Sequence, residues 1–307
     1  MGGAHLDRRG RIAGATAPAA SNPGRFIEEP GGGGFNAAAT MARLGHAVRL
    51  ISPRGGDAAG EQVAAAAEQA GIDDRPFVFL DRATPSYTAI LEQDGNLVVA
   101  LADMELYRTF SPRRLRVRAV RDALDAGGLL LVDANLPEET LDAIATAAAM
   151  RRMPLAAIAI SPAKVVRYAG CLDRIGLLFL NAAEAKALSG AQPADPACWP
   201  DILRALGLGS AVITDGAGAV IAFDDRATYR LLPPHLDATR DVTGAGDALA
   251  AGTLSALVEG HDLPQALRHG VAAAGLTLQS ANATCLDLTP ERLRLQLDLV
   301  PETATLS

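Results

Sequence analysis

The chain has 307 residues, 49% of them hydrophobic and 21% charged, which suits one large α/β domain or two small ones. A formal net charge of −7 argues against a nucleic-acid-binding protein, and no apolar stretch is long enough to cross a membrane. The three cysteines are widely spaced and suggest neither a metal site nor a disulfide framework, and we see no secretory signal. We therefore expect a cytoplasmic protein.

The first predicted unit is a glycine-rich loop that opens into a helix. Residues 1–7 are expected to end a first strand, and residues 8–30 to form edge strands and loops projecting from the main sheet. Glycines at 31–34 and Asn36 then lead into a helix of small residues that stops at Gly45. A dinucleotide-binding loop is a rival interpretation, but no Gly-x-Gly-x-x-Gly here is followed by an acid at the right distance.

A β-hairpin is predicted in the next part of the chain. Asp94-Gly95 between two apolar runs is a strong hairpin signal. Within an α/β pattern, such a hairpin suits a lid that excludes water from a site, although an ordinary sheet edge explains it equally well. We expect strands at 46–52, 77–80, 86–92 and 97–102 and a helix at 60–71.

From residue 111 the predicted elements alternate between helix and strand. Such alternation is typical of a parallel sheet covered on both faces, with ligands at the carboxyl ends of its strands. We interpret the chain as a single domain with lid segments at about 8–30 and 77–104. The expected helices are 111–126, 137–150, 248–258, 263–280 and 290–299, and the expected strands are 129–133, 155–160, 176–180, 211–214, 219–223 and 228–231.

The clearest chemical signal is residues 241–247, Asp-Val-Thr-Gly-Ala-Gly-Asp, directly before an apolar run. Gly244 and Gly246 allow a sharp turn, and the unpaired amides where a helix begins form an anion site suited to phosphate. An acid there would repel a merely bound phosphate. Asp247 fits better as a base that takes a proton from an attacking hydroxyl, while the amides of residues 244–246 stabilise the phosphoryl group. A glycine-rich helix cap without chemistry is the alternative.

Three motifs together resemble those of the ribokinase-like (PfkB-type) carbohydrate and nucleoside kinases. They are residues 31–36, Asn181-Ala-Ala-Glu184 and residues 241–247, in the family's order. The resemblance implies a three-layer αβα sandwich with a mostly parallel central sheet and a small inserted β lid. It also implies ATP-dependent phosphotransfer to a primary hydroxyl. No P-loop lysine motif is present, so such a transfer must use another phosphate site.

The resemblance also assigns roles to individual residues. Asp7, Gly32 and Asn36 would bind the hydroxyls of the acceptor, and Asp247, with Gly244, Ala245 and Gly246, would carry out the transfer. ATP and Mg²⁺ would involve Asn181 and Glu184, through water, although a helix capping box explains the same spacing. Further candidates are Thr214, Gly216 and Gly218 at the nucleotide, and Asp241 and Thr243 at a possible K⁺ site.

Residues 84–104 resemble the corresponding stretch of pseudouridine kinases, which brings Ser86, Asp103 and Met104 near a nucleobase. Lys164 fits the pattern Asp-Pro-Val-Ser-x-x-Lys of those enzymes, but the Asp-Pro is missing here. Pseudouridine is therefore the first candidate for the phosphate acceptor. Ribose, a fructose-type sugar, adenosine or uridine, a non-catalytic sensor and a nicotinamide dehydrogenase remain alternatives. The resemblance also suggests a homodimer through the lid, with no nucleic-acid polymer and no membrane as partner.

Overall fold

The computed structural model describes residues 1–236 and 243–306, which build two main sheets. The larger sheet has the order β15-β14-β13-β12-β11-β10-β9. Its strands β9 to β12 are parallel, and β13 to β15 extend it in antiparallel fashion. The bounds are β9 Leu130–Asp133, β10 Leu155–Ile158, β11 Leu177–Asn181, β12 Ala211–Thr214, β13 Val220–Phe223, β14 Thr228–Leu231 and β15 Ala304–Leu306.

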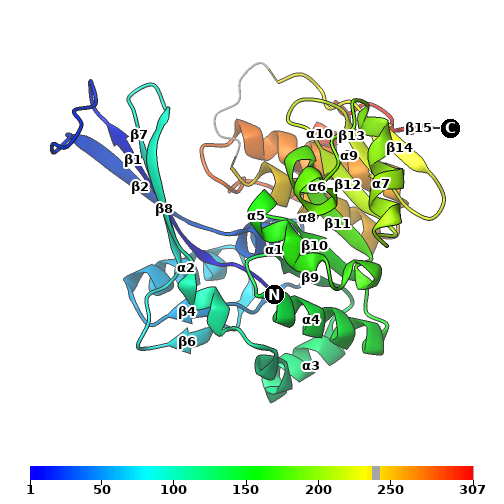
Figure 1. Ribbon diagram of the computed structural model, residues 1–307, viewed down its shortest axis with the longest axis horizontal. Coiled ribbons are helices and arrows are strands. Elements are labelled where there is room, and N and C mark those ends of the chain that lie inside the picture. The colour runs from blue at the N-terminus through cyan, green and yellow to red at the C-terminus, as the bar shows by residue number, and fades with distance from the viewer. Residues whose placement is uncertain (237–242, 307) are drawn as a thin grey trace.

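Helices cover both faces of this sheet (Figure 1). Strand β11 shows why, because its residues alternate between two cores: Leu178 packs with one layer of helices and Phe179 with the other. The expected three-layer αβα sandwich is confirmed. One layer holds α3 Arg118–Ala126, α4 Glu138–Arg151, α5 Pro162–Val165, α6 Ala182–Ser189 and α7 Trp199–Ala205, and the other α1 Gly33–Arg43, α8 Ala245–Val258, α9 Leu263–Gln279 and α10 Pro290–Leu297.

A smaller four-stranded sheet projects from this body (Figure 1). Its order is β2-β1-β7-β8, with β1 and β7 parallel in the middle. We call it the lid sheet. The expected strand at 77–80 is β6 (Phe77–Phe79), which pairs with β4 (Pro53–Gly55) outside the lid sheet. The lid strands are β1 His5–Ile12, β2 Gly24–Gly31, β7 Ser86–Leu91 and β8 Leu97–Asp103.

Two expected strands in the chain's first third need correction. The strand expected to end by residue 7 starts at His5, because residues 1 and 2 instead bond to Leu131 and Ile51 of the body. The strand expected at 46–52 shrinks to β3 (Arg49–Leu50), which pairs with β5 (Asp73–Asp74). Between them in the chain lies α2 (Ala58–Gln69), capped by Asp57.

The helix expected over 111–126 is broken at Val117. A 3₁₀ helix, η2 (Pro112–Arg116), precedes it, and α3 begins only after Val117, which has an extended backbone. The physical reason is a contact the local sequence does not reveal. The Arg114 guanidinium lies over the rings of Phe77 and Phe79, 4.9 and 5.0 Å from their centroids, and this fixes the first segment independently of the second.

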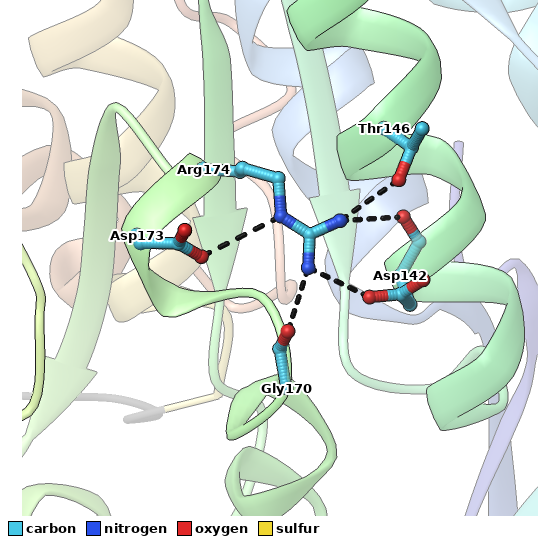
Figure 2. A network of polar contacts seen from close by, with 5 residues as sticks. All are labelled: Asp142, Thr146, Gly170, Asp173 and Arg174. Atoms are coloured by element: carbon cyan, nitrogen blue, oxygen red, sulfur yellow. Dashed lines mark hydrogen bonds and ion pairs between the residues drawn. The ribbon is translucent and has the colours of Figure 1, made fainter.

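The segment that follows β10 is fastened to α4 by Arg174 (Figure 2). This guanidinium donates to Oδ1 of Asp142 at 2.7 Å and to the Thr146 hydroxyl at 2.8 Å, both on α4. It also donates to the Gly170 carbonyl at 2.6 Å. Short 3₁₀ turns lie here, η3 (Val166–Tyr168) and η4 (Leu172–Arg174). None of the helices in the described part of the chain has the length and apolar character needed to span a membrane.

Candidate active site

Asp133, the last residue of β9, organises the edge of the sheet where a ligand is expected. It is fully buried, and its Oδ2 accepts hydrogen bonds from the backbone amides of Gly3 and Gly34, each at 2.7 Å. Its Oδ1 accepts from the amide of Asn135 at 2.9 Å. One carboxylate thus fixes the entry to β1, the start of α1 and the loop after β9. Sequence reasoning missed Asp133, although its place at the end of a predicted buried strand was the available signal.

Asp247 lies in the first turn of α8 and meets the start of α1. Its Oδ2 accepts a hydrogen bond of 2.8 Å from the side-chain amide of Asn36, across 211 positions of sequence. Gly33 allows this close approach, because a Cβ added there would lie 3.2 Å from Oδ1 of Asp247 and 3.4 Å from Oδ2 of Asp133. The two outer sequence motifs therefore form one site.

The environment of Asp247 changes its proton affinity. Burial raises the pKa of the Asp247 carboxyl to about 7, the hydrogen bond from Asn36 opposes the rise, and the charges of Asp133, Asp7 and Glu184 add to it. A carboxyl with a pKa near neutrality can both take up and release a proton at physiological pH. That property suits a general base and is not needed for a helix cap.

The start of α8 presents backbone donors beside this carboxyl. The amide of Ala248 bonds to the Gly244 carbonyl at 2.8 Å, so the amides of residues 245–247 precede the helical ladder. Gly244 has φ of 76°, and a Cβ there would collide with the Ala283 carbonyl oxygen. Thr243 is exposed. Asp241, the other predicted cation ligand, lies outside the described residues.

A polar chain runs from the lid sheet into the body. Asp7 of β1 lies 3.2 Å from Nε2 of His5, whose Nδ1 lies 2.8 Å from the hydroxyl of Tyr107 on the 3₁₀ helix η1 (Glu105–Thr109). Gly31 leaves room for Asp7, since a Cβ there would collide with the carboxylate, and Gly32 precedes the first turn of α1. No sequence motif marked His5 or Tyr107.

Lys164 approaches the same edge from α5. Its Nζ donates to Oδ1 of Asn135 at 2.6 Å, and burial lowers the pKa of this ammonium group. Arg167 holds the loop that carries Asn135, donating to the carbonyls of Ala134 at 2.7 Å and of Asn135 at 3.0 Å. Asn135 was not predicted as a site residue.

Two buried polar atoms at this edge are left without a partner. Within residues 1–236 and 243–306, Oδ1 of Asn36 and Nδ2 of Asn135 have no hydrogen-bond partner. Buried polar atoms are normally satisfied, so these two are candidates to contact a ligand. One is an acceptor and the other a donor, which matches a polyhydroxylated or carbonyl-bearing molecule.

The predicted nucleotide residues lie farther along the same edge. Asn181 and Glu184 form a reciprocal capping box at the start of α6, with bonds of 2.9 and 2.7 Å. Thr214 ends the neighbouring strand directly opposite Asn181. Gly216 and Gly218 form the turn after β12, where the Gly218 amide bonds to the Asp215 carbonyl at 2.8 Å. The capping interpretation is therefore correct, and the position at the sheet edge is also compatible with binding.

ATP-dependent phosphotransfer implies a Mg²⁺ ion, and the negative charge of the carboxylates at this edge of the sheet would attract it. Four carboxylates, those of Asp7, Asp133, Glu184 and Asp247, are close enough for the first three to raise the pKa of the fourth. Burial also raises the pKa of Glu184. In the described part of the chain no group of three His, Cys, Asp or Glu side chains could hold a metal ion alone. These residues fit a cation that shares its ligands with phosphates and water.

The strand register separates the residues of the expected acceptor pocket. Asp7 pairs with Tyr87, whereas Ser86 pairs with Leu6 and Asp103. Because successive side chains alternate between faces, Ser86 and Asp103 lie on the face of the lid sheet opposite Asp7. Asp103 is exposed, and Met104, just beyond β8, is half-buried. On β7, Tyr87 pairs with Asp7 and lies on the same face.

Comparison with known proteins identifies the family of the chain. The model of the pfkB family carbohydrate kinases matches residues 7–289, and the chain belongs to this family. It is 28% identical over 296 residues to the pseudouridine kinase of Escherichia coli K12, covering 94% of this chain and 92% of that protein. It is 25% identical to the ribokinase of Haemophilus influenzae, covering 82% of each. The match is to kinases, so the dehydrogenase alternative is dropped.

Solved structures agree. A carbohydrate kinase from Agrobacterium tumefaciens is 56% identical and superimposes with a TM-score of 0.91, covering 99% of this chain and 98% of that one. A ribokinase of Arabidopsis thaliana, solved with ribose and ATP, has a TM-score of 0.85 at 21% identity, covering 96% of each chain, and shares the fold. The chain is thus a phosphotransferase of the ribokinase-like fold.

Proposed function

We propose that this kinase transfers the γ-phosphoryl group of ATP to the primary 5′-hydroxyl of a nucleoside, with pseudouridine as the first candidate. The observation that carries the proposal is the hydrogen bond between Asn36 and Asp247. It joins the segment expected to bind the acceptor to the helix expected to bind phosphate. In this proposal the chain acts as one catalytic domain with the lid sheet over its site.

Each side chain has one task in the proposed transfer. Asp7 and Asn36 bind the hydroxyl groups of the acceptor. Oδ1 of Asn36, which has no partner within the described residues, accepts a hydrogen bond from one of these hydroxyls. Asp247, with its pKa raised to about 7, takes the proton of the attacking hydroxyl. The amides at the start of α8 stabilise the charge on the phosphoryl group as it passes to the acceptor.

Binding of the donor involves the edge beyond β11. Asn181 and Glu184 would hold Mg²⁺ through water, which suits an ion that keeps several waters and binds phosphate oxygens. Thr214, Gly216 and Gly218 would lie along the nucleotide. A K⁺ site would use Thr243 together with Asp241.

Two features favour a nucleoside over a free sugar. The similarity to the E. coli pseudouridine kinase extends over nearly the whole chain. Asn135 and Lys164 also offer adjacent donors, an amide without a partner and an ammonium group, beside the acceptor residues. Donors at that position suit the carbonyl oxygens of a pyrimidine base.

An acceptor screen tests this proposal. The enzyme, ATP and Mg²⁺ are combined with pseudouridine, uridine, ribose, fructose or adenosine, and kcat/KM is measured for each. The proposal predicts that pseudouridine leads ribose, fructose and adenosine by at least about tenfold, since unpaired buried donors penalise an acceptor without matching oxygens. Equal or better turnover of a free sugar rejects the nucleoside. Binding of an acceptor without turnover of any favours a sensor.

We also propose that two copies associate through their lid sheets. Phe26, Val99 and Leu101 are 63, 57 and 71% exposed. The register places all three on the face of the lid sheet away from Asp7. A contiguous apolar patch of this kind is typical of an interface, and pairing two such faces would bury it without covering the catalytic side.

A further inference from the structure

The chain turns sharply at Ile160, just after β10. The amide of Ser161 donates to the carbonyl of Ala159 at 2.8 Å, a bond that spans one residue, and Ile160 between them has φ of 70°. A γ-turn with positive φ is rare and strained, and a β-branched side chain increases the strain. The other non-glycine residues with positive φ in the described chain are Ala19, in the lid, and Arg152, which caps α4.

Both flanks of this turn are held in place. The Ala159 amide bonds to the Phe179 carbonyl of β11 at 3.0 Å, and the Tyr168 hydroxyl bonds to the Ile158 carbonyl at 3.1 Å. Arg174 fastens the following segment to α4 (Figure 2). A strained backbone persists when its surroundings leave no alternative, and such strain concentrates at functional sites.

The strained turn directs the Ile160 side chain to the catalytic edge. A Cβ added to Gly33 would collide with Cδ1 of Ile160 and would lie 3.2 Å from Oδ1 of Asp247. The Ile160 methyl and the Asp247 carboxylate are therefore neighbours on one side of the Gly33 backbone. Ile160 also packs against the apolar cores on both faces of the main sheet.

We propose that Ile160 is a positioning residue that excludes water from the Asp247 carboxylate, so that the base serves the bound alcohol alone. A methyl group offers water no hydrogen bond, and the site beside it is unfavourable for a water molecule. The proposal deepens the proposed function and rests on Asp247 as its base.

The consequence is chemical. In the productive step the acceptor oxygen forms a bond to the γ-phosphorus, the bond to the bridging oxygen breaks, ADP leaves with the electron pair, and the hydroxyl proton passes to Asp247. A water molecule in the acceptor's place undergoes the same bond changes and gives inorganic phosphate. Removal of the Ile160 side chain should therefore open a hydrolytic leak.

The experiment measures ADP and inorganic phosphate with Mg²⁺ and ATP alone, and then with pseudouridine added. The variants are Ile160→Ala, Ile160→Gly and the conservative Ile160→Val. Arg152→Gly is the matched control, because it relaxes a positive-φ residue at the end of α4. We expect acceptor-free hydrolysis to rise about fivefold or more in the Ala and Gly variants, to rise less in Ile160→Val, which lacks only the Cδ1 methyl, and to stay at the wild-type level in Arg152→Gly.

A merely structural role predicts a different pattern. If Ile160→Ala and Ile160→Gly lose stability and turnover together while acceptor-free hydrolysis stays at the wild-type level, the proposal is overturned. Ile160→Gly also relieves the strain, so it separates a leak from a folding defect. Different results would reject the proposed function: an Asp247→Asn variant that still transfers phosphate, or a wild-type enzyme that phosphorylates no acceptor. Acceptor-free hydrolysis is measured in either case.

Discussion

The side-chain amide of Asn36 lies 2.8 Å from Oδ2 of Asp247, and this contact joins the first turns of α1 and α8. Asn36 also has an unused hydrogen-bond acceptor, because its Oδ1 is buried without a partner in the described chain. One side chain can therefore orient the base and bind the acceptor at once. In the proposed transfer, a single residue would set the positions of both reacting groups.

Replacing Asn36 should impair turnover more than folding. Asn36→Ala removes the donor that fixes Asp247, and we expect kcat/KM to fall about 100-fold, the scale of a small misplacement at a reacting centre. Thr40→Ala is the control, because Thr40 bonds to the Asn36 carbonyl one turn along α1 without contacting Asp247. The control should lower the melting temperature while kcat/KM stays within about threefold. Equal activity losses in both variants would argue against a special role for Asn36.

The activity should depend on pH through Asp247. Its pKa is raised to about 7, and the base works in its ionised form, so kcat/KM should rise with pH and level off above 7. Below 7 it should fall about tenfold per pH unit. Because the Asn36 hydrogen bond lowers this pKa, Asn36→Ala should move the inflection to higher pH. A rate profile flat between pH 5.5 and 8 would contradict this assignment.

The start of α8 should tolerate no side chain at position 244. Gly244→Ala combines an unfavourable φ of 76° with a collision against the Ala283 carbonyl, so the chain must shift at the proposed phosphate site. The conformational part alone costs about 1–2 kcal/mol. Gly260→Ala is the control, with φ of 94° and open space around it just beyond the other end of α8. We expect both variants to melt earlier and only Gly244→Ala to lose kcat, by about 100-fold.

A charge introduced on the face of the lid sheet away from Asp7 should dissociate the proposed dimer. Leu101→Lys places an ammonium group in the exposed apolar patch, and sedimentation velocity should show a shift from dimer to monomer. Leu80→Lys is the control, because Leu80 is 89% exposed but lies outside the lid sheet, and this variant should remain dimeric. A wild-type protein that sediments as a monomer at micromolar concentration would refute the lid dimer.

Much of the fold follows from local sequence. The parallel strands are short apolar runs between amphipathic helices, and the turn into α8 is marked by Gly244 and Gly246 before an apolar helix. Both depend on residues close together in the chain. The break at Val117 does not, because it arises from Arg114 packing on two distant aromatic rings.

The site was only partly predictable for related reasons. Asp133 organises the edge of the sheet because Gly3 and Gly34 bring their amides to it, which no local pattern shows. The sequence also could not show that Ser86 and Asp103, expected near a nucleobase, lie on the face of the lid sheet opposite Asp7, because the face depends on the register with β1. The turn at Ile160 contains neither glycine nor asparagine, the usual signals of positive φ.

The most direct test of the account is the transfer rate of Asp247→Asn. Single-turnover assays with ATP, Mg²⁺ and pseudouridine would be run beside equilibrium measurements of acceptor binding. If Asp247 is the base, the rate falls about 10³-fold while the dissociation constant of the acceptor changes only about threefold, since the amide keeps its contact with Asn36. A variant that transfers phosphate within about tenfold of the wild-type rate would contradict the account.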